Sequence, residues 1–334
     1  MNQTKDQSGA GGNRWSGRQL RGWLLPTLLW MFQGGVEAKS PAVAPIGTAS
    51  AEVQEQVWGG AAIRKENCAA GVPVRPLGNA HAHNDYAHSR PLQDALAHGF
   101  QHIEVDIHLI GEELYVAHDL PAVPDPARTL ARLYLEPLQE ILQQQGMDEY
   151  PCQDNPLNLV IDIKSDADRT YERLKEYLSP YLSWITAYEG DAVRRRAVNI
   201  LLSGNRPVER LLGDENRLMA LDGRVDDLGK GIPRGSIPLV SENFRNIFGE
   251  KESGWQQPNG QWLVFRKLVR LAAGEGKIIR LWGSPEEEAC WTKLLRNGAG
   301  IINVDDLGRL RRFMLLYQWG RPHLSRDGRP LAAG

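Results

Sequence analysis

The chain has 334 residues, with 39 lysines and arginines against 41 aspartates and glutamates, and a formal net charge of −2. Nucleic-acid-binding proteins carry an excess of basic residues, which this chain lacks, so we expect no nucleic-acid partner. Hydrophobic residues make up 42% of the chain, which is typical of a globular protein with one large domain and short extensions. No apolar run reaches the ~18 residues that a membrane-spanning helix needs.

The first 38 residues have the pattern of an export signal. A short apolar core at residues 23–32 is followed by small residues that end at Ala38. Cleavage after Ala38 predicts a secreted or periplasmic protein, and the alternative is an uncleaved N-terminal membrane anchor. Four basic residues precede the apolar core: Lys5, Arg14, Arg18 and Arg21.

The domain boundaries follow from composition. Residues 39–75 are rich in Ala, Gly, Pro and Val and predict a linker, residues 76–320 predict the folded domain, and residues 321–334 predict a tail. Three cysteines are widely spaced, and export would permit one disulfide between two of them. No CxxC pair occurs, so we expect no structural zinc site and a structural role for Cys68, Cys152 and Cys290.

Between residues 76 and 320, short apolar runs alternate with amphipathic stretches. Eight runs predict strands, at residues 77–81, 102–109, 157–164, 198–203, 218–222, 237–241, 277–282 and 300–305. A further segment at 113–117 predicts a hairpin with the second strand. Helices are expected at 90–98, 129–145, 166–189, 207–213, 262–274 and 285–297. This alternation favours an α/β fold, a single (β/α)8 TIM barrel, over a doubly wound sheet, whose glycine-rich phosphate loop is absent from the sequence.

The second strand carries the strongest chemical signal. Polar and apolar residues alternate strictly from His102 to Leu109, so Glu104 and Asp106 share one face with His102 and His108. In a barrel the apolar face packs under helices, which directs the two carboxylates inward. Two buried carboxylates need a positive partner, and oxygen ligands favour Mg²⁺ or Ca²⁺. The alternative is an ion-paired set that faces solvent on an edge strand.

The third strand repeats this pattern, with Asp162 and Lys164 on the same face near its C-terminal end. Active sites of TIM barrels lie at that end of the strands. We therefore expect Glu104, Asp106 and Asp162 to form an open metal site. Lys164 would either bind a phosphate or an oxyanion, or neutralise Asp162, and both roles are compatible.

Seven of the eight histidines fall between residues 81 and 118. His83 follows the first strand and His118 ends the hairpin segment, so both are expected beside the carboxylates. Two imidazoles suit acid–base catalysis on a phosphodiester, because one can remove a proton and the other can protonate the leaving group. Of the later strands, one places Arg280 and Trp282 on the same face, as candidates for phosphate binding and for an apolar wall.

These residues resemble the phosphatidylinositol-phospholipase-C-like superfamily, and within it the glycerophosphodiester phosphodiesterases. The sequence is most similar to the subfamily of altered inheritance of mitochondria protein 6. The matching segments run in order through most of the predicted domain: His83-Asn-Asp-Tyr86, Arg90-Pro-Leu92, Ile103-Glu-Val-Asp106, Val116-Ala-His-Asp119, Ile161-Asp-Ile-Lys164, Ser203-Gly-Asn-Arg-Pro207, Asp222-Gly-Arg224, Arg280-Leu-Trp282 and Ile302-Asn-Val-Asp-Asp306.

The resemblance implies a metal-dependent phosphoric diester hydrolase with a TIM barrel. It assigns the catalytic pair to His83 and His118 and the ligands of one divalent cation to Glu104, Asp106 and Asp162, with Lys164 lining the site. The usual His-Arg-Gly opening of glycerophosphodiesterases is His83-Asn-Asp here, and the usual Pro-Glu-Asn-Thr, whose Glu binds the metal, is Arg90-Pro-Leu. The resemblance gives no role to His81.

The expected substrates are small or lipid-derived phosphodiesters, including glycerophosphodiesters, lysophospholipids and inositol phosphodiesters. Two alternatives remain. The His81-Ala-His83 pair also resembles the opening of amidohydrolases and of PHP phosphoesterases, but both of those classes need further histidines from middle strands, and only His323 follows His118. The second alternative is a catalytically inactive barrel that binds a ligand. The oligomeric state does not follow from the sequence.

Overall fold

The computed structural model describes residues 74–144, 156–190, 192–249, 254–256 and 260–319. Contacts divide the chain into Met1–Thr48 and Ala49–Gly334, and every described residue belongs to the second unit. The predicted export signal and tail lie outside the described residues, as do Cys68 and Cys152. Cys290 is buried and free. None of the described helices has the length and apolarity needed to cross a lipid bilayer.

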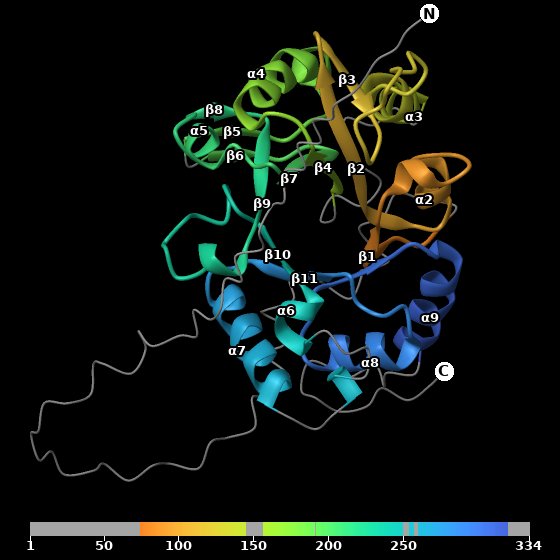
Figure 1. Cartoon of the computed structure of the whole chain (residues 1–334), viewed down its shortest axis with the longest axis vertical. Coiled ribbons are helices and arrows are strands. Elements are labelled where there is room, and N and C mark those ends of the chain that lie inside the picture. Colours follow the sequence, from red (N-terminus) through yellow and green to blue (C-terminus); the bar gives the residue numbers. More distant parts are fainter. Residues whose placement is uncertain (1–73, 145–155, 191, 250–253, 257–259, 320–334) are drawn as a thin grey trace, which may run out of the picture. The chain divides into compact units, whose positions relative to one another are not determined.

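A nine-stranded sheet forms the centre of the described residues (Figure 1). Its strand order is β1-β12-β11-β10-β9-β7-β4-β2-β3, and a further pairing of β1 with β2 closes it into a barrel. All the pairings are parallel except that of β3, which returns antiparallel on β2. The barrel therefore has eight parallel strands, which confirms the predicted TIM barrel.

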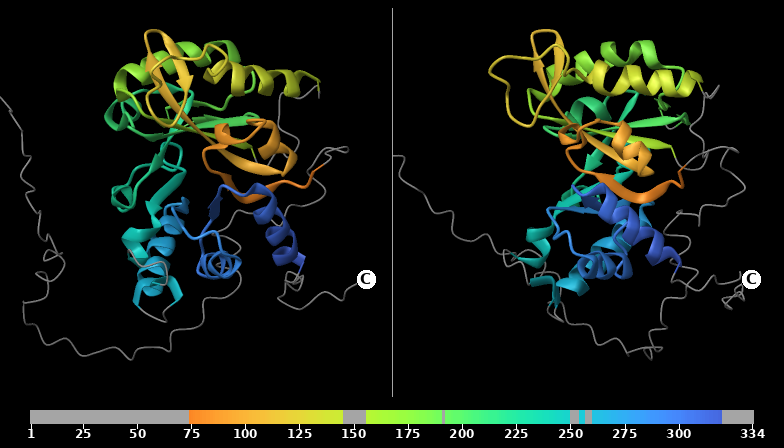
Figure 2. Two further views of the ribbon diagram at one scale, coloured as in Figure 1. Left: turned by 45° about the vertical axis from the view of Figure 1, so that its right-hand side comes forward. Right: turned by 90° about the vertical axis from the view of Figure 1, so that its right-hand side faces the viewer.

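The predicted strands all form within a few residues of their expected ends. The barrel strands are β1 (Leu77–Ala82), β2 (Phe100–Ile110), β4 (Leu157–Ile163), β7 (Val198–Gly204), β9 (Met219–Gly223), β10 (Leu239–Asn243), β11 (Ile278–Trp282) and β12 (Ile301–Val304). The hairpin strand is β3 (Glu113–Val116), and β2 continues beyond its pairing with β4 to meet it (Figure 2). A separate three-stranded sheet contains β5 (Ala187–Glu189), β6 (Ala192–Arg194) and β8 (Asn216–Arg217).

Helices follow most barrel strands, as the predicted alternation requires. They are α2 (Gln93–Ala97), α3 (Glu136–Gln144), α4 (Ala167–Leu178), α5 (Val208–Leu212), α6 (Phe244–Phe248), α7 (Gly260–Gly274), α8 (Glu288–Arg296) and α9 (Leu307–Trp319). Shorter turns are η1 (Asp85–Ala87), η3 (Ser179–Tyr181), η4 (Val225–Asp227) and η5 (Gly254–Gln256), and η2 (Ala131–Leu135) is π-helical. Between β9 and β10 the chain forms only η4.

Two helical expectations differ from the structure. The helix expected over 166–189 begins at the Asp166 cap, whose side chain accepts a hydrogen bond from Arg169 N, but ends at Leu178. Pro180 follows in η3, and it lacks the N–H that would continue the helix, so residues 187–189 are free to form β5. The sequence pattern also missed α9, which follows the last barrel strand.

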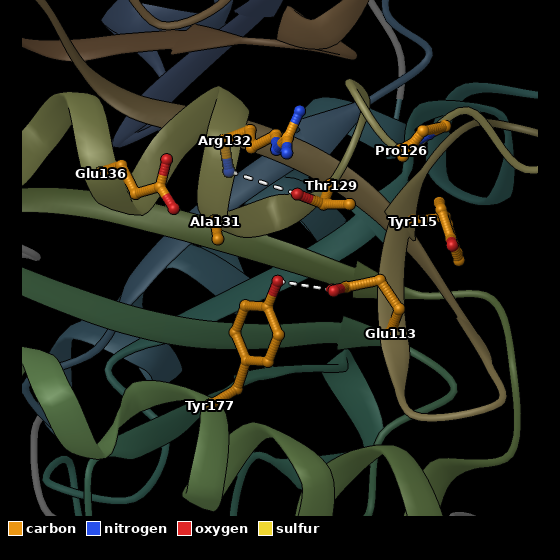
Figure 3. Close-up of a pocket in the computed structure, with 8 residues that line it drawn as sticks. All are labelled: Glu113, Tyr115, Pro126, Thr129, Ala131, Arg132, Glu136 and Tyr177. Atoms are coloured by element: carbon orange, nitrogen blue, oxygen red, sulfur yellow. Dashed lines mark hydrogen bonds between the residues drawn. The ribbon is translucent and has the colours of Figure 1, made fainter.

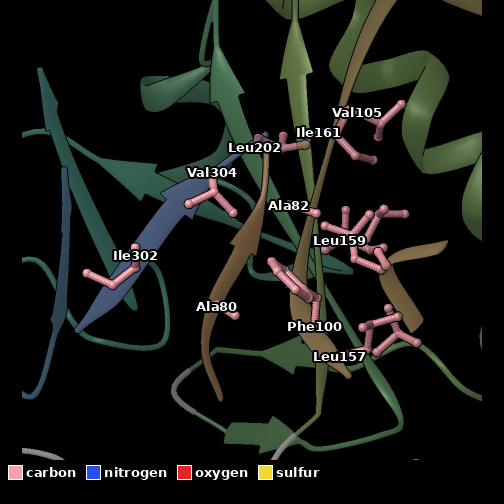
Figure 4. Close-up of a cluster of buried hydrophobic side chains, with 14 of the residues drawn as sticks. Ala80, Ala82, Phe100, Val105, Leu157, Leu159, Ile161, Leu202, Ile302 and Val304 are labelled. Atoms are coloured by element: carbon pink, nitrogen blue, oxygen red, sulfur yellow. The ribbon is translucent and has the colours of Figure 1, made fainter. Parts of the chain in front are cut away.

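Two apolar layers hold the barrel together. The larger layer packs between the outer face of the strands and the helices and includes Val105, Leu159 and Ile161 (Figure 4). The smaller cluster contains the inward-facing Val160, Leu201, Ala220, Leu239 and Ile301 of the barrel strands, together with Tyr188 of β5. Strand alternation thus fills the lower interior with apolar side chains. Polar side chains occupy the next inward positions toward the strands' C-terminal ends.

Candidate active site

Three carboxylates meet at the C-terminal ends of β2 and β4. Asp106 pairs with Asp162 in the parallel register, and Glu104 lies two residues before Asp106 on the same face. One oxygen from each of the three side chains lies within 4.8 Å of the others. Glu104 and Asp106 are buried, and Asp162 is half-buried. The alternative of an ion-paired set on a solvent-facing edge strand is wrong for β2, which pairs on both sides inside the barrel.

Lys164 lies between two of these carboxylates. Its Nζ is 3.1 Å from Asp106 Oδ2 and 3.1 Å from Asp162 Oδ1, and Tyr86 donates a hydrogen bond to Asp106 Oδ2 at 2.9 Å. Burial would lower the pKa of Lys164, but Asp162 and Asp106 outweigh it and raise that pKa, so the ammonium stays charged at neutral pH. Lys164 therefore forms an ion pair with Asp162, in line with one of its two predicted roles.

Glu104 is held from the opposite side by groups from distant strands. Arg280 Nη1 donates to Glu104 Oε2 at 2.8 Å and to Asn303 Oδ1 at 3.3 Å, and Arg280 Nη2 lies 3.4 Å from Asp222 Oδ2. Burial alone would raise the pKa of Glu104, but the charge of Arg280 and the hydrogen bond from His81 hold it below its ordinary range. Arg280 thus binds the Glu104 carboxylate, whereas the sequence predicted that it would bind phosphate.

His81 gains a role from this network. Its Nε2 is 2.5 Å from Glu104 Oε2, and the ring is fully buried against Arg280. Burial, and next the charge of Arg280, lower the pKa of His81 to about 4, so the imidazole is neutral at pH 7 and donates its Nε2–H to Glu104. The alternation of β1 places His81 inward, but only the barrel closure reveals its partner.

The three carboxylates fit a hard divalent cation. All the candidate donors are oxygens, which suits Mg²⁺ or Ca²⁺ rather than a thiolate-binding metal. Asp106 Oδ1 is buried and has no hydrogen-bond partner among the described residues. Burial raises the pKa of Asp106 and raises the pKa of Asp162 to about 6, and the negative charges of the neighbouring carboxylates act in the same direction. The charge of Lys164 lowers both pKa values but only partly offsets these effects. A bound cation would supply the missing positive charge.

The two predicted catalytic histidines lie on loops at the same end of the barrel. His83 follows β1, and its Nδ1 is 2.8 Å from Asp305 Oδ1, on the loop after β12. His118 follows β3, directly after Ala117, whose N–H donates to the Asp106 carbonyl at 3.3 Å. The His118 side chain is 64% exposed and pairs with Asp119 at 3.0 Å. In the described residues, no hydrogen bond or ion pair joins the two imidazoles.

Trp282 ends β11, two residues beyond Arg280, and is 40% exposed. Its exposure leaves an indole face available at the mouth of the barrel, where the sequence predicts an apolar wall. The Trp282 side chain makes no hydrogen bond or aromatic contact with the described residues.

Gly204 is a site residue that the sequence reasoning missed. It ends β7 with φ +66°, and a Cβ at this position would overlap Asp162 Oδ1 and lie 2.6 Å from the Ile163 carbonyl. Glycine adopts this conformation without strain and leaves room for the Asp162 carboxylate. The signal was present in the Ser203-Gly-Asn segment, but nothing local shows that the glycine faces an acid 42 residues earlier.

A cavity of about 200 Å³ lies outside this site (Figure 3). None of the predicted site residues lines it, and Tyr177 closes one side by donating a hydrogen bond to Glu113 Oε1 at 2.5 Å. Its lining residues are Glu113, Tyr115, Pro126, Thr129, Ala131, Arg132, Glu136 and Tyr177. The cavity is therefore separate from the carboxylate cluster.

Several known proteins are similar to this chain in sequence. A family profile described as an AIM6-like phosphodiesterase domain matches residues 72–221. Altered inheritance of mitochondria protein 6 of Eremothecium gossypii is 30% identical over 298 residues, covering 75% of this chain and 75% of that protein. A homologue from Arthroderma benhamiae is 25% identical over 262 residues, covering 70% of this chain and 82% of that protein.

Among solved structures, a glycerophosphodiester phosphodiesterase of Parabacteroides distasonis has a TM-score of 0.41 and 11% identity, covering 74% of this chain and 97% of that one. One from Agrobacterium tumefaciens has a TM-score of 0.38 and 12% identity, covering 72% and 97%.

The closed barrel, the acidic cluster at its mouth and the matched domain define a phosphodiesterase-like (β/α)8 protein. With 30% identity across three quarters of both chains, this protein belongs to the altered inheritance of mitochondria protein 6 family. The predicted family resemblance is thereby confirmed.

Proposed function

We propose that this protein is a metal-dependent phosphoric diester hydrolase that acts on glycerophosphodiesters or related lipid-derived phosphodiesters. The carboxylate cluster carries the proposal: Glu104, Asp106 and Asp162 place oxygens within 4.8 Å of one another, beside the Lys164 ammonium. The match to a phosphodiesterase domain over residues 72–221 supports the reaction class.

The carboxylates would hold Mg²⁺ or Ca²⁺, which when bound supplies a Lewis acid for a non-bridging phosphoryl oxygen. His81 and Arg280 orient Glu104, and Tyr86 orients Asp106, so neither carboxylate must reorganise during the reaction. Lys164 stabilises the negative charge of the phosphoryl group, because its ammonium is positively charged and lies between two of the proposed metal ligands.

The two imidazoles would move the protons. Asp305 accepts from His83 Nδ1–H, which fixes the tautomer and leaves Nε2 as the basic atom. In this scheme His83 removes the proton from the attacking oxygen, and His118 donates one to the leaving alkoxide. The attacking oxygen is water, or a neighbouring hydroxyl of the substrate through a cyclic phosphate. Trp282 contacts the organic part of the substrate.

A panel of phosphodiesters tests this proposal, with each reaction run in Mg²⁺, Ca²⁺ and chelator and the products identified by mass. We expect turnover that needs a divalent cation, and a cyclic product if the substrate hydroxyl attacks. Glu104→Gln should abolish the turnover, whereas Glu172→Gln, an exposed acid paired with Arg210 outside the barrel, should not.

Two results would contradict the proposal. Turnover that survives the chelator would remove the metal from the mechanism. A folded protein that hydrolyses none of the phosphodiesters with either metal would instead be the ligand-binding barrel that the sequence left as an alternative.

A further inference from the structure

One of the clustered histidines connects two loops at the mouth of the barrel. His88 caps the C-terminal end of η1, which follows β1, and Asp305 lies directly after β12. His88 Nε2 is 3.0 Å from the Asp305 carbonyl oxygen, although 217 residues of sequence separate the two. The His88 side chain is only 23% exposed. The proposed chemistry uses Asp305 to hold His83 and gives no part to His88.

The His88 ring faces a hydrogen-bond acceptor on each side. Its Nδ1 is 3.0 Å from the Asp85 carbonyl oxygen, which also accepts the backbone N–H of His88 at 3.0 Å. Both ring partners are carbonyl oxygens, and a carbonyl oxygen can only accept a hydrogen bond. Nε2 is therefore the donor to Asp305. The two ring contacts are hydrogen bonds at the same time only when both nitrogens carry a proton and the ring is positively charged.

The segment that carries His88 is held in the core through Asp85. This side chain is fully buried, and its Oδ2 accepts hydrogen bonds from the Leu92 N–H at 2.6 Å and from the Tyr134 hydroxyl at 2.9 Å. Leu92 has φ +63°, a strained angle for a residue with a Cβ, which persists where surrounding contacts hold the backbone. His88 thus extends toward Asp305 from a segment whose position is fixed.

The Asp305 carboxylate depends on its backbone for its position. The side chain is 76% exposed, and the His83 ring that it contacts at 2.8 Å is 33% exposed. An ion pair so open to water adds little stability and does not by itself hold a side chain in place. The backbone of Asp305 is held on both sides, because its N–H donates to the Glu286 carboxylate and its carbonyl accepts from His88. These contacts fix the point from which the carboxylate reaches His83.

We propose that His88 is a positioning residue, which joins the Asp85 segment to the loop after β12 and so keeps the Asp305 carboxylate on His83 Nδ1. His83 then stays in the tautomer whose Nε2 can accept a proton. This inference rests on the proposed function for the role of His83 as the base. Loss of the His88 ring should lower kcat and leave KM nearly unchanged, because no contact with the substrate is removed.

A double-mutant cycle, measured with the most active phosphodiester of the panel, tests whether His88 acts through Asp305. His88→Ala and Asp305→Ala should each lower kcat about 10- to 100-fold, as the loss of a group that orients an active-site residue does. The double variant should be no slower than Asp305→Ala alone, because His88 then has no carboxylate to position. His88→Gln keeps a side-chain N–H near the position of Nε2 and should recover part of the rate.

His98→Ala is the matched control. The His98 ring is also partly buried, but it bonds the Asp94 carbonyl of the helix that it caps, away from Asp305. Its removal should leave kcat unchanged.

The tautomer of His83 gives a second readout, which needs no turnover. Proton–nitrogen correlation spectra of protein with labelled histidine distinguish a proton on Nδ1 from a proton on Nε2, and His83→Gln identifies the signal. In the wild-type chain the neutral His83 ring should carry its proton on Nδ1. In His88→Ala the fraction with the proton on Nε2 should rise, and in His98→Ala it should not.

The two readouts separate this inference from the proposed function. If no phosphodiester is hydrolysed but the His83 tautomer still depends on His88, the connection stands and the proposed reaction fails. Rate losses that multiply in the double variant, a change in KM alone, or a His83 tautomer unaffected by His88→Ala would overturn the inference. If His88→Ala does not fold, His88→Asn replaces it, because the shorter amide lies near the position of Nδ1 and keeps only the contact with Asp85; it should show the same losses.

Discussion

Replacing Gly204 with alanine tests whether the position of Asp162 determines cation binding. Gly204 has φ +66°, which costs an alanine about 1–2 kcal/mol. The new Cβ would also overlap Asp162 Oδ1 and lie 2.9 Å from Asp162 Cγ, so the carboxylate must move. Such overpacking adds roughly 1–3 kcal/mol. We expect a total loss of about 2–5 kcal/mol in the free energy of unfolding.

Gly111 provides a matched control. It lies in the turn between β2 and β3 with φ +64°, and a Cβ there meets nothing within 4 Å. Gly111→Ala therefore carries the backbone cost alone, about 1–2 kcal/mol. The difference between Gly204→Ala and Gly111→Ala isolates the collision with Asp162.

Thermal unfolding with and without Mg²⁺ or Ca²⁺ measures both effects. A cation at about 100 times its Kd stabilises a folded protein by about 2.7 kcal/mol, which raises Tm by roughly 5–11 °C in a domain of this size. Gly111→Ala should keep this rise and Gly204→Ala should lose most of it. If Gly204→Ala keeps the full rise, then either Asp162 has not moved or it does not bind the cation, and the reasoning fails.

Three further predictions concern the histidines and Cys290. His118→Ala should lower kcat by roughly 10²–10⁴ without unfolding the protein, and the wild-type pH–rate profile should be bell-shaped; an unchanged kcat would exclude His118 from proton transfer. In chelator, the free energy of unfolding in urea should fall as the pH drops from 6.5 toward 4. The reason is that burial lowers the pKa of His81 to about 4 and that of His102 to about 3, so the unfolded chain takes up protons first. Burial raises the pKa of Asp162 to about 6, and this shift opposes the fall in the free energy of unfolding. His102→Gln should make the fall smaller; a fall of the same size in this variant would contradict the contribution assigned to His102. Burial raises the pKa of the Cys290 thiol to about 12, so in a variant with the other cysteines changed to serine a disulfide reagent should react at pH 8 only after unfolding.

The sequence by itself determined the barrel and the acidic cluster. Strict alternation in β2 and β4 decides which side chains face inward, because the period of a strand is two residues. Parallel neighbouring strands then bring Asp106 level with Asp162, as the register shows. These relations are local or join adjacent strands, so they can be inferred from pattern and strand order alone.

Only the tertiary structure decided what surrounds that cluster. Arg280 reaches Glu104 across 176 residues of sequence, and His83 pairs with Asp305 across 222. Closure of the barrel between β1 and β2, and between β1 and β12, creates these contacts. No periodicity encodes them, because they depend on how far each inward side chain extends across the barrel. For the same reason the need for glycine at position 204 becomes visible only when Asp162 is seen beside it.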